Sequence, residues 1–388
     1  MSHALLSPSG ASRWMTCTPS ARLEEQFPNT TSVYAEEGTA AHALAEIFVN
    51  YHTGKIGVDP FDAALEAFKG NEYANDEMYT YILGYASYIT ELFNEVRAAT
   101  QDALLESEVK LDLSKYVPGG FGTSDVIIIA DGMMNVIDLK YGKGVSVSAE
   151  NNKQMMIYAL GALEQYGWMY DIKNVRMTVY QPRLDNISAW EISAGKLLSW
   201  AETALKPKAE MAFDGAGEYQ AGEHCRFCRA KAVCRARAEA NLRLAQYEFK
   251  PGTLLSDAEI GDILKIAENL KNWVDNVTAY ALEQAINGVK YEGWKLVEGR
   301  SVRVIDEKEA APVLEGLYGK DQIYNVKLKG IGDLEKLMGK KEFNAAVGPL
   351  ISRPLGKPTL VPETDKRPEW KAAAAADFED ADLSNLSA

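Results

Sequence analysis

A predicted β-hairpin carries two aspartates at equal distances from its turn. The turn is Asp131-Gly132, a dipeptide typical of a two-residue hairpin loop between apolar runs. In that register Asp125 and Asp138 face each other across two antiparallel strands, with Cβ atoms about 4.5–5.5 Å apart. Lys140 follows Asp138 by two residues, so its side chain points to the same face of the sheet. The pattern therefore predicts two carboxylates and an ammonium group in one place.

The residues around these carboxylates are apolar on both faces of the hairpin, which predicts two buried central strands. Two opposed carboxylates in such a place repel each other and lose hydration, at a cost of roughly several kcal/mol each. A divalent cation between them removes the conflict, and oxygen ligands suit Mg²⁺ or Mn²⁺. A lysine beside the ion could activate a water molecule or stabilise charge on a phosphate. The alternative is an exposed strand end with two ordinary surface acids, and the residues alone leave both interpretations open.

Three of the four cysteines lie close together as Cys225-x2-Cys228-x5-Cys234, and Cys17 lies far upstream. Four thiolates are the usual ligand set of an iron–sulfur cluster or of a structural Zn²⁺ site. Zinc could also take His224 in place of Cys17, and four unrelated buried cysteines are the third interpretation. The spacing predicts a metal centre without separating iron from zinc.

The cysteine segment is also locally basic. Residues 226–243 contain one acidic residue, Glu239, and six basic residues: Arg226, Arg229, Lys231, Arg235, Arg237 and Arg243. Such a cluster could contact phosphate groups, and a solvated helix face is the equal alternative.

The composition sets the class of protein. The chain has 388 residues, enough for two or three domains at about 150 residues each. The net charge of −14 argues against a histone-like protein that coats nucleic acid, but it permits an enzyme with a local basic groove. The few cysteines argue against a disulfide-rich secreted scaffold. Because neither a signal peptide nor an apolar run of about 20 residues is evident, we expect a soluble cytoplasmic protein without membrane contact.

Hydrophobic periodicity predicts the elements that position these residues. Candidate strands lie at 104–111, 121–130, 133–140, 174–181 and 187–192, and candidate helices at 34–51, 75–99, 149–166, 194–213 and 256–287. Residues 1–30 look irregular, a loop follows residue 51, and a short β-like segment is expected at 290–304. The predicted fold class is α/β, with a mixed central β-sheet flanked by helices.

Three parts of the chain are predicted from changes in composition. Residues 1–250 hold the sheet and the cysteines, and residues 251–361 read as an accessory, mostly helical domain. Residues 362–388, rich in alanine and acidic side chains, are expected to be a disordered tail.

The order of the motifs resembles the RecB-like branch of the PD-(D/E)xK nuclease superfamily. Gly122-Thr123-Ser124-Asp125 followed by Asp138-Leu139-Lys140 is similar to the superfamily core, with aspartate where glutamate is commoner. Gly38-Thr39-Ala40-Ala41-His42 and Gln154-Met155-Met156-Ile157-Tyr158 are similar to two helix motifs of the branch, which includes AddB and CRISPR-associated exonucleases. The resemblance covers about residues 10–245 and implies a restriction-endonuclease-like core. The whole chain also resembles a family of phage- and prophage-encoded proteins.

The resemblance implies roles for the residues that match. Asp125, Asp138, the Leu139 carbonyl and His42 would bind Mg²⁺ or Mn²⁺. Lys140 would act on the attacking water or on the scissile phosphate. Together, Asp125, Asp138 and Lys140 would form the catalytic set.

Other residues would support that site. Gln154 and Tyr158, four residues apart on one helix face, would contact DNA or hold the site in place. Glu46 follows His42 by one helical turn and could orient it, or could simply be solvated. Either Glu106 or Glu108 on the preceding strand could face the site, and spacing does not decide which.

The cysteines carry a separate implication of the resemblance. Cys17, Cys225, Cys228 and Cys234 would hold a 4Fe–4S iron–sulfur cluster that staples together the two ends of the nuclease domain. A structural Zn²⁺ is the alternative. Arg226 and Arg229 beside the cluster would contact DNA.

The function implied is a metal-dependent DNA nuclease, an exonuclease acting on DNA ends or single strands. It would work in phage recombination or DNA processing in the cytoplasm of a bacterial host, with a phage recombination or single-strand-binding protein as a further partner. The first alternative is a non-catalytic DNA-binding scaffold that keeps the nuclease fold, against which the intact Asp125, Asp138 and Lys140 argue. The second is a zinc-stabilised interaction module.

Overall fold

The computed structural model describes residues 4–29, 32–242, 256–297, 307–318, 320–324 and 330–351. The chain divides into two compact units, Met1–Val289 and Lys290–Ala388. The predicted boundary at residue 250 and the predicted tail at 362–388 lie outside the described residues, so the three-part division stays a prediction.

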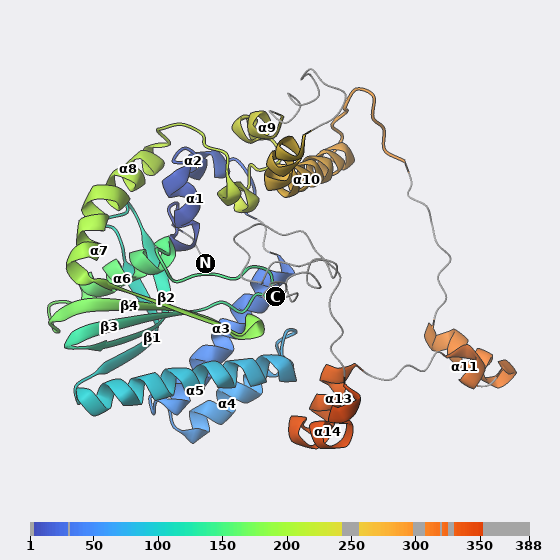
Figure 1. Cartoon of the computed structure of the whole chain (residues 1–388), viewed down its shortest axis with the longest axis horizontal. Helices are drawn as coiled ribbons and strands as arrows, with labels where there is room; N and C mark the ends of the chain where they lie inside the picture. The colour runs from blue at the N-terminus through green and yellow to red at the C-terminus, as the bar shows by residue number, and fades with distance from the viewer. Residues whose placement is uncertain are drawn as a thin grey trace, which may run out of the picture. The chain divides into compact units, whose positions relative to one another are not determined.

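A five-stranded mixed sheet, with its strands in chain order, forms the centre of the first unit. Figure 1 shows this sheet between helices. The strands are β1 (Leu104–Asp112), β2 (Phe121–Ala130), β3 (Gly132–Leu139), β4 (Ile172–Gln181) and β5 (Asn186–Ser193). Neighbours pair antiparallel, except that β3 and β4 are parallel. A parallel pair needs a long crossover connection, and the helix between β3 and β4 supplies it. Each strand lies where the hydrophobic periodicity predicts it.

The β2–β3 hairpin has the predicted register. Val126 pairs with Ile137, and Ala130 pairs with Met133 beside the turn. Both strands are central in the sheet and almost continuously buried. Asp125 and Asp138 therefore occupy opposite positions, one step beyond the pair Val126–Ile137.

Helices cover both faces of the sheet (Figure 1). One face carries α3 (Val33–His52), α4 (Val58–Phe68) and α5 (Asp76–Ala99). The other carries α1 (Ala11–Thr16), α2 (Ser20–Glu24), α6 (Lys153–Tyr166), α7 (Ala194–Trp200) and α8 (Lys206–Asp214), with a π-helical turn joining α7 to α8. Each face buries its own cluster of apolar residues, called here the α5-side core and the α6-side core. The predicted mixed sheet flanked by helices is confirmed.

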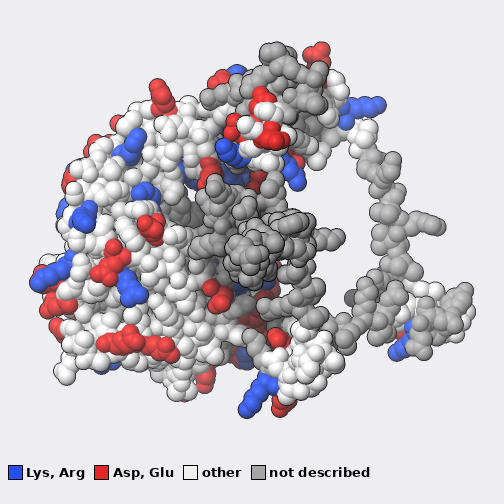
Figure 2. All heavy atoms as spheres, viewed as in Figure 1, with Lys and Arg blue, Asp and Glu red and all other residues white. Residues whose placement is uncertain are grey.

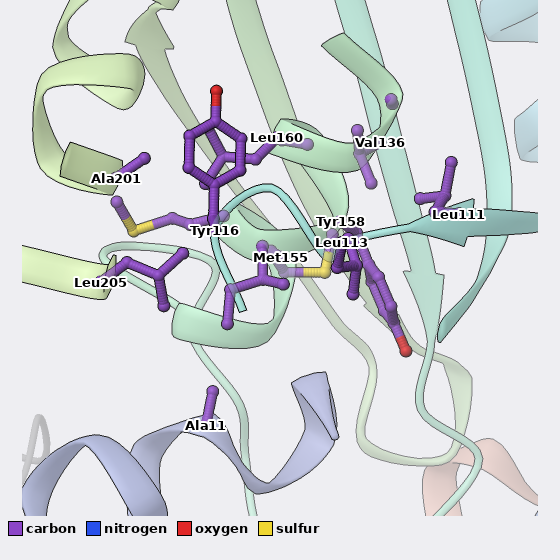
Figure 3. Packing of buried hydrophobic residues seen from close by; sticks show 14 of the residues in the cluster. Ala11, Leu111, Leu113, Tyr116, Val136, Met155, Tyr158, Leu160, Ala201 and Leu205 are labelled. Atoms are coloured by element: carbon purple, nitrogen blue, oxygen red, sulfur yellow. The ribbon is translucent and has the colours of Figure 1, made fainter. Parts of the chain in front are cut away.

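The α6-side core holds the helix that carries the predicted Gln154–Tyr158 motif. Figure 3 shows Met155 and Tyr158 of α6 beside Leu113, which follows β1. A Cβ added at Gly161 of α6 would lie 2.6 Å from the Leu113 side chain, so only glycine allows this approach. The motif is thereby held tightly against the sheet.

Side-chain caps fix where the site-bearing helices begin. Ser32 accepts from the Ala35 amide at the start of α3, and Asn75 accepts from the Met78 amide at the start of α5. Asn152 accepts from the amides of Gln154 and Met155 at the start of α6. Such caps satisfy amides that have no partner within the helix.

Three stretches differ from the expectation. Residues 1–30 contain α1 and α2, which have only six and five residues and are too short for periodicity to reveal. The expected loop after α3 contains α4, whose Phe61, Leu65 and Phe68 recur at helical spacing between Gly- and Asp-rich flanks. In the β-like segment expected at 290–304, residues 290–297 form no strand, and the rest lies outside the described residues.

The described C-terminal residues are helical, as predicted. The first unit ends with α9 (Arg235–Leu242) and α10 (Asp257–Ile286), and the second contains α11 (Glu307–Tyr318), α12 (Lys320–Ile323), α13 (Ile331–Met338) and α14 (Lys340–Val347). Among the described residues, no helix has the length and apolar composition needed to cross a bilayer.

Candidate active site and cysteine cluster

Three side chains from three elements converge at one end of the sheet. They are His42 from α3, Glu108 from β1 and Asp125 from β2, and their ligand atoms all lie within 4.8 Å of one another. His42 Nδ1 is 3.3 Å from Asp125 Oδ1. Imidazole and carboxylate ligands suit a divalent metal ion, and this is the one such group among the described residues. The structure thus brings together two of the predicted ligands and adds Glu108.

Glu108 reaches this group through an unusual backbone conformation. Its φ of 49° is left-handed, although it lies within a strand and is not glycine. Before it, Leu105 belongs to the α5-side core, whereas Val109 and Leu111 after it belong to the α6-side core. The strand therefore exchanges its faces at Glu108, and the carboxylate turns toward His42 on the α5 side. In a strand with an unbroken period of two, Glu106 and Glu108 lie on the same face. Strand alternation therefore could not choose between them, and it does not foresee the left-handed residue.

A second polar group lies against α6. Lys140 Nζ is 2.9 Å from Asp138 Oδ2 and donates to Gln154 Oε1 at 3.0 Å. Gln154 Nε2 in turn donates to Asp138 Oδ1 at 3.0 Å. Gln154 thus fixes both the carboxylate and the ammonium group, which is the supporting role the sequence predicts.

The two groups meet at the backbone of Leu139. Its amide donates to Asp125 Oδ2 at 2.7 Å, between the side chains of Asp138 and Lys140. Although Asp125 and Asp138 hold opposite positions, each is held by different partners: Asp125 by His42 and Leu139, Asp138 by Lys140 and Gln154. Asp138 is therefore absent from the group of three ligands, and its predicted metal contact stays a prediction.

Burial and mutual repulsion perturb the ionisation of the site. Burial raises the pKa of Glu108 to about 7, and the negative charge of Asp125 adds to the rise. Burial acts to lower the pKa of His42, but the Asp125 carboxylate outweighs it and raises that pKa to about 9. Burial likewise opposes ionisation of Asp125, yet His42 holds its pKa below the usual value. Burial raises the pKa of Asp138, although Lys140 opposes the rise. Protons on Glu108 and His42 thus offset part of the negative charge of the carboxylates. A bound cation could take the place of those protons.

The pocket around the three ligands fits a cation. Glu46 also lines it, one helical turn from His42 as predicted, and the buried Tyr85 hydroxyl lines it without a hydrogen-bond partner among the described residues. Ser107 beside Glu108 is fixed by Asn50 of α3, whose Oδ1 accepts from its hydroxyl at 2.7 Å. The pocket therefore offers carboxylate oxygens and an imidazole nitrogen, with more negative than positive side chains. Mg²⁺ or Mn²⁺ would bind such ligands and balance their charge.

Tyr158 explains the glycine of the Gly122–Asp125 motif. A Cβ at Gly122 would lie 2.9 Å from Cε1 of the Tyr158 ring. Tyr158 is buried, and burial raises its pKa, so its phenol stays protonated. Its place is consistent with supporting the site from the α6 side.

Arg183, which sequence reasoning missed, ties the site-bearing elements together. Its guanidinium is 2.8 Å from Glu37 of α3 and 3.6 Å from Glu77 of α5. It also lies over the ring of Tyr141, next to Lys140, at 4.6 Å from the centroid. Nothing in the local sequence signals contacts between residues nearly 150 positions apart.

All four cysteines line one pocket, as the sequence predicts for a metal centre. Cys17 comes from the end of α1, and Cys225, Cys228 and Cys234 come from the segment before α9. The backbone amides of Gln220 and Gly222 donate to the sulfurs of Cys17 and Cys225, both at 3.4 Å. Among the described residues, the cysteines form no group whose ligand atoms lie within 4.8 Å of one another. His224 accompanies them, with its Nε2 3.8 Å from Cys225 Sγ.

The buried Glu24 side chain joins the N-terminal helices to the cysteine segment. Glu24 is bound by the Arg13 side chain at 2.8 Å and by the Arg229 amide at 2.7 Å. The Arg229 side chain donates to the Phe27 carbonyl at 3.1 Å, so one of its donors serves this junction. Arg226 is exposed and lies 5.6 Å from the centroid of the Phe227 ring. On the face shown in Figure 2, Lys and Arg are interspersed with Asp and Glu.

A family described as "Protein of unknown function (DUF2800)" matches residues 3–368, almost the whole chain. The chain belongs to the DUF2800 family. A solved structure titled "Crystal structure of SSO0001" is similar at 17% identity, over 56% of this chain and 95% of that chain, with a TM-score of 0.23. A likeness that weak carries no argument, so the DUF2800 site must be interpreted from its own geometry.

In this DUF2800 chain, Glu108→Gly is expected to raise stability while weakening metal binding. Glycine adopts a positive φ without strain and removes a carboxylate beside Asp125, so the free energy of unfolding should rise by about 1 kcal/mol. Urea titration measures the first effect, and calorimetric titration with Mn²⁺ measures the second. Glu106→Gly is the matched control because Glu106 has no positive φ, and it should lose about 0.5–1 kcal/mol. Equal stability changes in both variants would contradict the role of Glu108.

Metal binding by the DUF2800 protein should tighten as pH rises. The pKa of Glu108 is raised from 4.5 to about 7 and that of His42 from 6.5 to about 9, so their protonated forms stabilise the fold at low pH. That stability is lost as pH rises through those values, while the deprotonated ligands become available. Mn²⁺ affinity should rise by about tenfold per pH unit where one proton leaves per ion bound. Calorimetry at pH 6, 7, 8 and 9 tests this, and a flat profile would exclude these groups as ligands.

Proposed function

We propose that this protein is a metal-dependent DNA nuclease of the RecB-like branch of the PD-(D/E)xK superfamily, with a restriction-endonuclease-like core. The observation that carries the proposal is the convergence of His42, Glu108 and Asp125 within 4.8 Å, beside a lysine paired with Asp138. Glu108 and Asp125 come from the neighbouring strands β1 and β2, and His42, more than 60 residues before Glu108, comes from a helix. Their approach concentrates negative charge that an ordinary core would avoid.

In this proposal His42, Glu108 and Asp125 hold Mg²⁺ or Mn²⁺, with Asp138 and the Leu139 carbonyl as further predicted ligands. The bound ion would supply Lewis-acid polarisation of a phosphate and a more acidic water. Asp125 holds His42 in orientation through the contact at Nδ1. Lys140, kept protonated by Asp138 although burial acts to lower its pKa, offers a positive charge to the scissile phosphate. Gln154 keeps that ammonium group in place.

We further propose that the four cysteines hold a 4Fe–4S cluster. All four cysteines line one pocket, so four sulfurs are available as ligands there. The amides that donate to the sulfurs of Cys17 and Cys225 would stabilise thiolates, which are the ligating form. Structural zinc remains the alternative to be measured.

The substrate proposed is DNA, at ends or as single strands, with Arg226 and Arg229 as candidate phosphate contacts. A phage recombination or single-strand-binding protein is the proposed partner, in the cytoplasm of a bacterial host. These assignments rest on the sequence motifs, and the exposed guanidinium of Arg226 is compatible with them.

A cleavage assay tests the proposal. End-labelled linear DNA and circular DNA, each single- and double-stranded, are incubated with the full chain in Mg²⁺, Mn²⁺ or EDTA. We expect degradation of linear DNA that depends on the metal, and release of labelled mononucleotides would indicate an exonuclease. Binding without cleavage in either metal would favour the scaffold function instead.

A further inference from the structure

A cavity of about 210 Å³ lies between α5 and the turn that joins β4 to β5. Its wall includes Thr80, Tyr81, Gly84, Tyr180, Asp185 and Asn186. None of these residues belongs to the candidate active site or matches a sequence motif. The volume is below the roughly 300–1,000 Å³ of pockets for drug-sized molecules, so it suits one flat ring system.

The cavity adjoins the candidate active site through a single tyrosine. Tyr180 pairs with Leu139 across β3 and β4, and its carbonyl accepts from the Lys140 amide at 2.9 Å. The Tyr180 ring packs against Tyr85, with centroids 5.2 Å apart, and Tyr85 lines the pocket of His42 and Asp125. Tyr180 therefore contacts both the wall of the cavity and a tyrosine that lines the pocket of the three candidate ligands.

The chemistry of the wall favours a nucleobase over a phosphate. Tyr81 and Tyr180 provide aromatic faces on which an unstacked base can lie. Gly84 has no side chain, and this keeps the space open between the helix and Tyr180. Asp185 is exposed, and its carboxylate makes no hydrogen bond or ion pair with the described residues. A free carboxylate repels phosphate but accepts hydrogen bonds from the amino group of a base.

Asp185 is also set in place by its backbone. Its φ of 50° is left-handed, and it ends the short helical turn after β4. The side-chain amide of Gln181, by contrast, is already hydrogen-bonded. Its Nε2 donates to the Val145 carbonyl, and its Oε1 accepts from the Val147 amide and from Asn186 Nδ2. Among the residues of the cavity wall, Asp185 thus supplies a charged acceptor for a ligand.

We propose that this cavity binds one unstacked, amino-bearing base of a DNA strand whose phosphate lies at the group of His42, Glu108 and Asp125. The inference rests on the proposed nuclease function and deepens it, since it names what part of the substrate is recognised. A carboxylate acceptor favours adenine, cytosine or guanine over thymine, which has no amino group.

Two variants test the cavity without dismantling the fold. Gly84→Leu fills it, and leucine is a better helix former than glycine; the added Cβ would stand 3.6 Å from the Tyr180 hydroxyl, an ordinary contact. Asp185→Asn removes the charge, and asparagine tolerates the left-handed conformation. Gly195→Leu on α7 is the matched control because nothing lies within 4 Å of its Cβ position.

The measurement is fluorescence anisotropy of labelled single-stranded DNA with the full chain in Ca²⁺, which reports binding independently of cleavage. A single abasic site is moved along the oligonucleotide, and the base at the sensitive position is then varied. We expect one position at which base loss weakens wild-type binding about 5- to 100-fold, the range that stacking of one base supplies. Gly84→Leu should lose that sensitivity, Asp185→Asn should lose only the preference against thymine, and Gly195→Leu should behave as wild type.

The outcomes separate the two proposals. A wild-type protein that binds DNA with equal affinity wherever the abasic site lies would overturn the cavity alone. The same sensitive position in Gly84→Leu as in wild type would also overturn it. Failure of the wild type to bind any DNA would overturn the nuclease proposal together with this inference.

Discussion

Asp125→Asn is expected to reduce metal-dependent DNA cleavage by at least about 10³-fold. Asparagine keeps the shape of the side chain and an oxygen that can accept from the Leu139 amide. The substitution removes the negative charge of Asp125, which holds His42 in place and which raises the pKa of Glu108. The group of three ligands therefore loses the carboxylate that contacts His42. Single-turnover cleavage of end-labelled DNA measures the loss, and titration with Mn²⁺ should show weaker binding.

Glu106→Gln is the control for that experiment. Glu106 is two residues from Glu108 on the same strand, but its carboxylate pairs with Lys55 at 2.7 Å and is absent from the ligand group. Its activity should remain within about twofold of wild type, since surface ion pairs contribute little. Wild-type activity in Asp125→Asn, or an equal loss in Glu106→Gln, would show that the chemistry lies elsewhere.

Lys140→Met separates binding of metal from hydrolysis. The ammonium group contacts Asp138 and Gln154 and is absent from the ligand group of His42, Glu108 and Asp125. We therefore expect Mn²⁺ affinity to stay close to wild type, while cleavage falls by about 10²–10³-fold. A parallel loss of both would mean that Lys140 acts by holding Asp138 in the metal site.

The hairpin shows what sequence can establish. Asp131-Gly132 fixed the turn, the turn fixed the register, and the register placed Asp125 opposite Asp138. Each of these steps is local, and the pairing of Val126 with Ile137 confirms the register. Periodicity likewise placed His42 and Gln154 on helices, although α6 begins at Lys153 and not at residue 149.

Glu108 and Arg183 show why the rest of the site was not predicted. Glu108 faces His42 because one backbone angle exchanges the faces of β1, and no residue preference announces a left-handed glutamate. Arg183 binds Glu37 and Glu77, which lie in helices more than 100 positions earlier, so only tertiary packing brings the charges together. The cysteines are intermediate. Their spacing predicted that they lie together, whereas the hydrogen bond from the Arg229 amide to Glu24, which joins the two segments, was not visible.

Cys228→Ala is expected to lower the melting temperature by about 10 °C or more. A centre that joins Cys17 to the segment at 225–234 closes a loop of about two hundred residues, for which cross-link entropy gives about 5 kcal/mol. For a domain of this size, each kcal/mol of lost stability lowers the melting temperature by about 2–4 °C, which gives the expected fall. Burial raises the pKa of the Cys228 thiol to about 12, so without a metal it would stay protonated, and only a ligated thiolate makes its removal so costly.

Val233→Ser is the matched control, since Val233 lies beside Cys234 and is 47% exposed. It should melt within about 2 °C of wild type, as exposed substitutions usually change stability by less than 0.5 kcal/mol. Iron, sulfide and zinc analysis of anaerobically purified wild type, together with its visible spectrum, identifies the centre. A brown protein with about four iron atoms per chain supports the cluster. A colourless protein with one zinc ion per chain would show a structural zinc site instead. Either metal predicts the fall in melting temperature, because the loop is closed in both cases. Unchanged melting and metal content in Cys228→Ala would show that the four cysteines share a pocket without forming a centre.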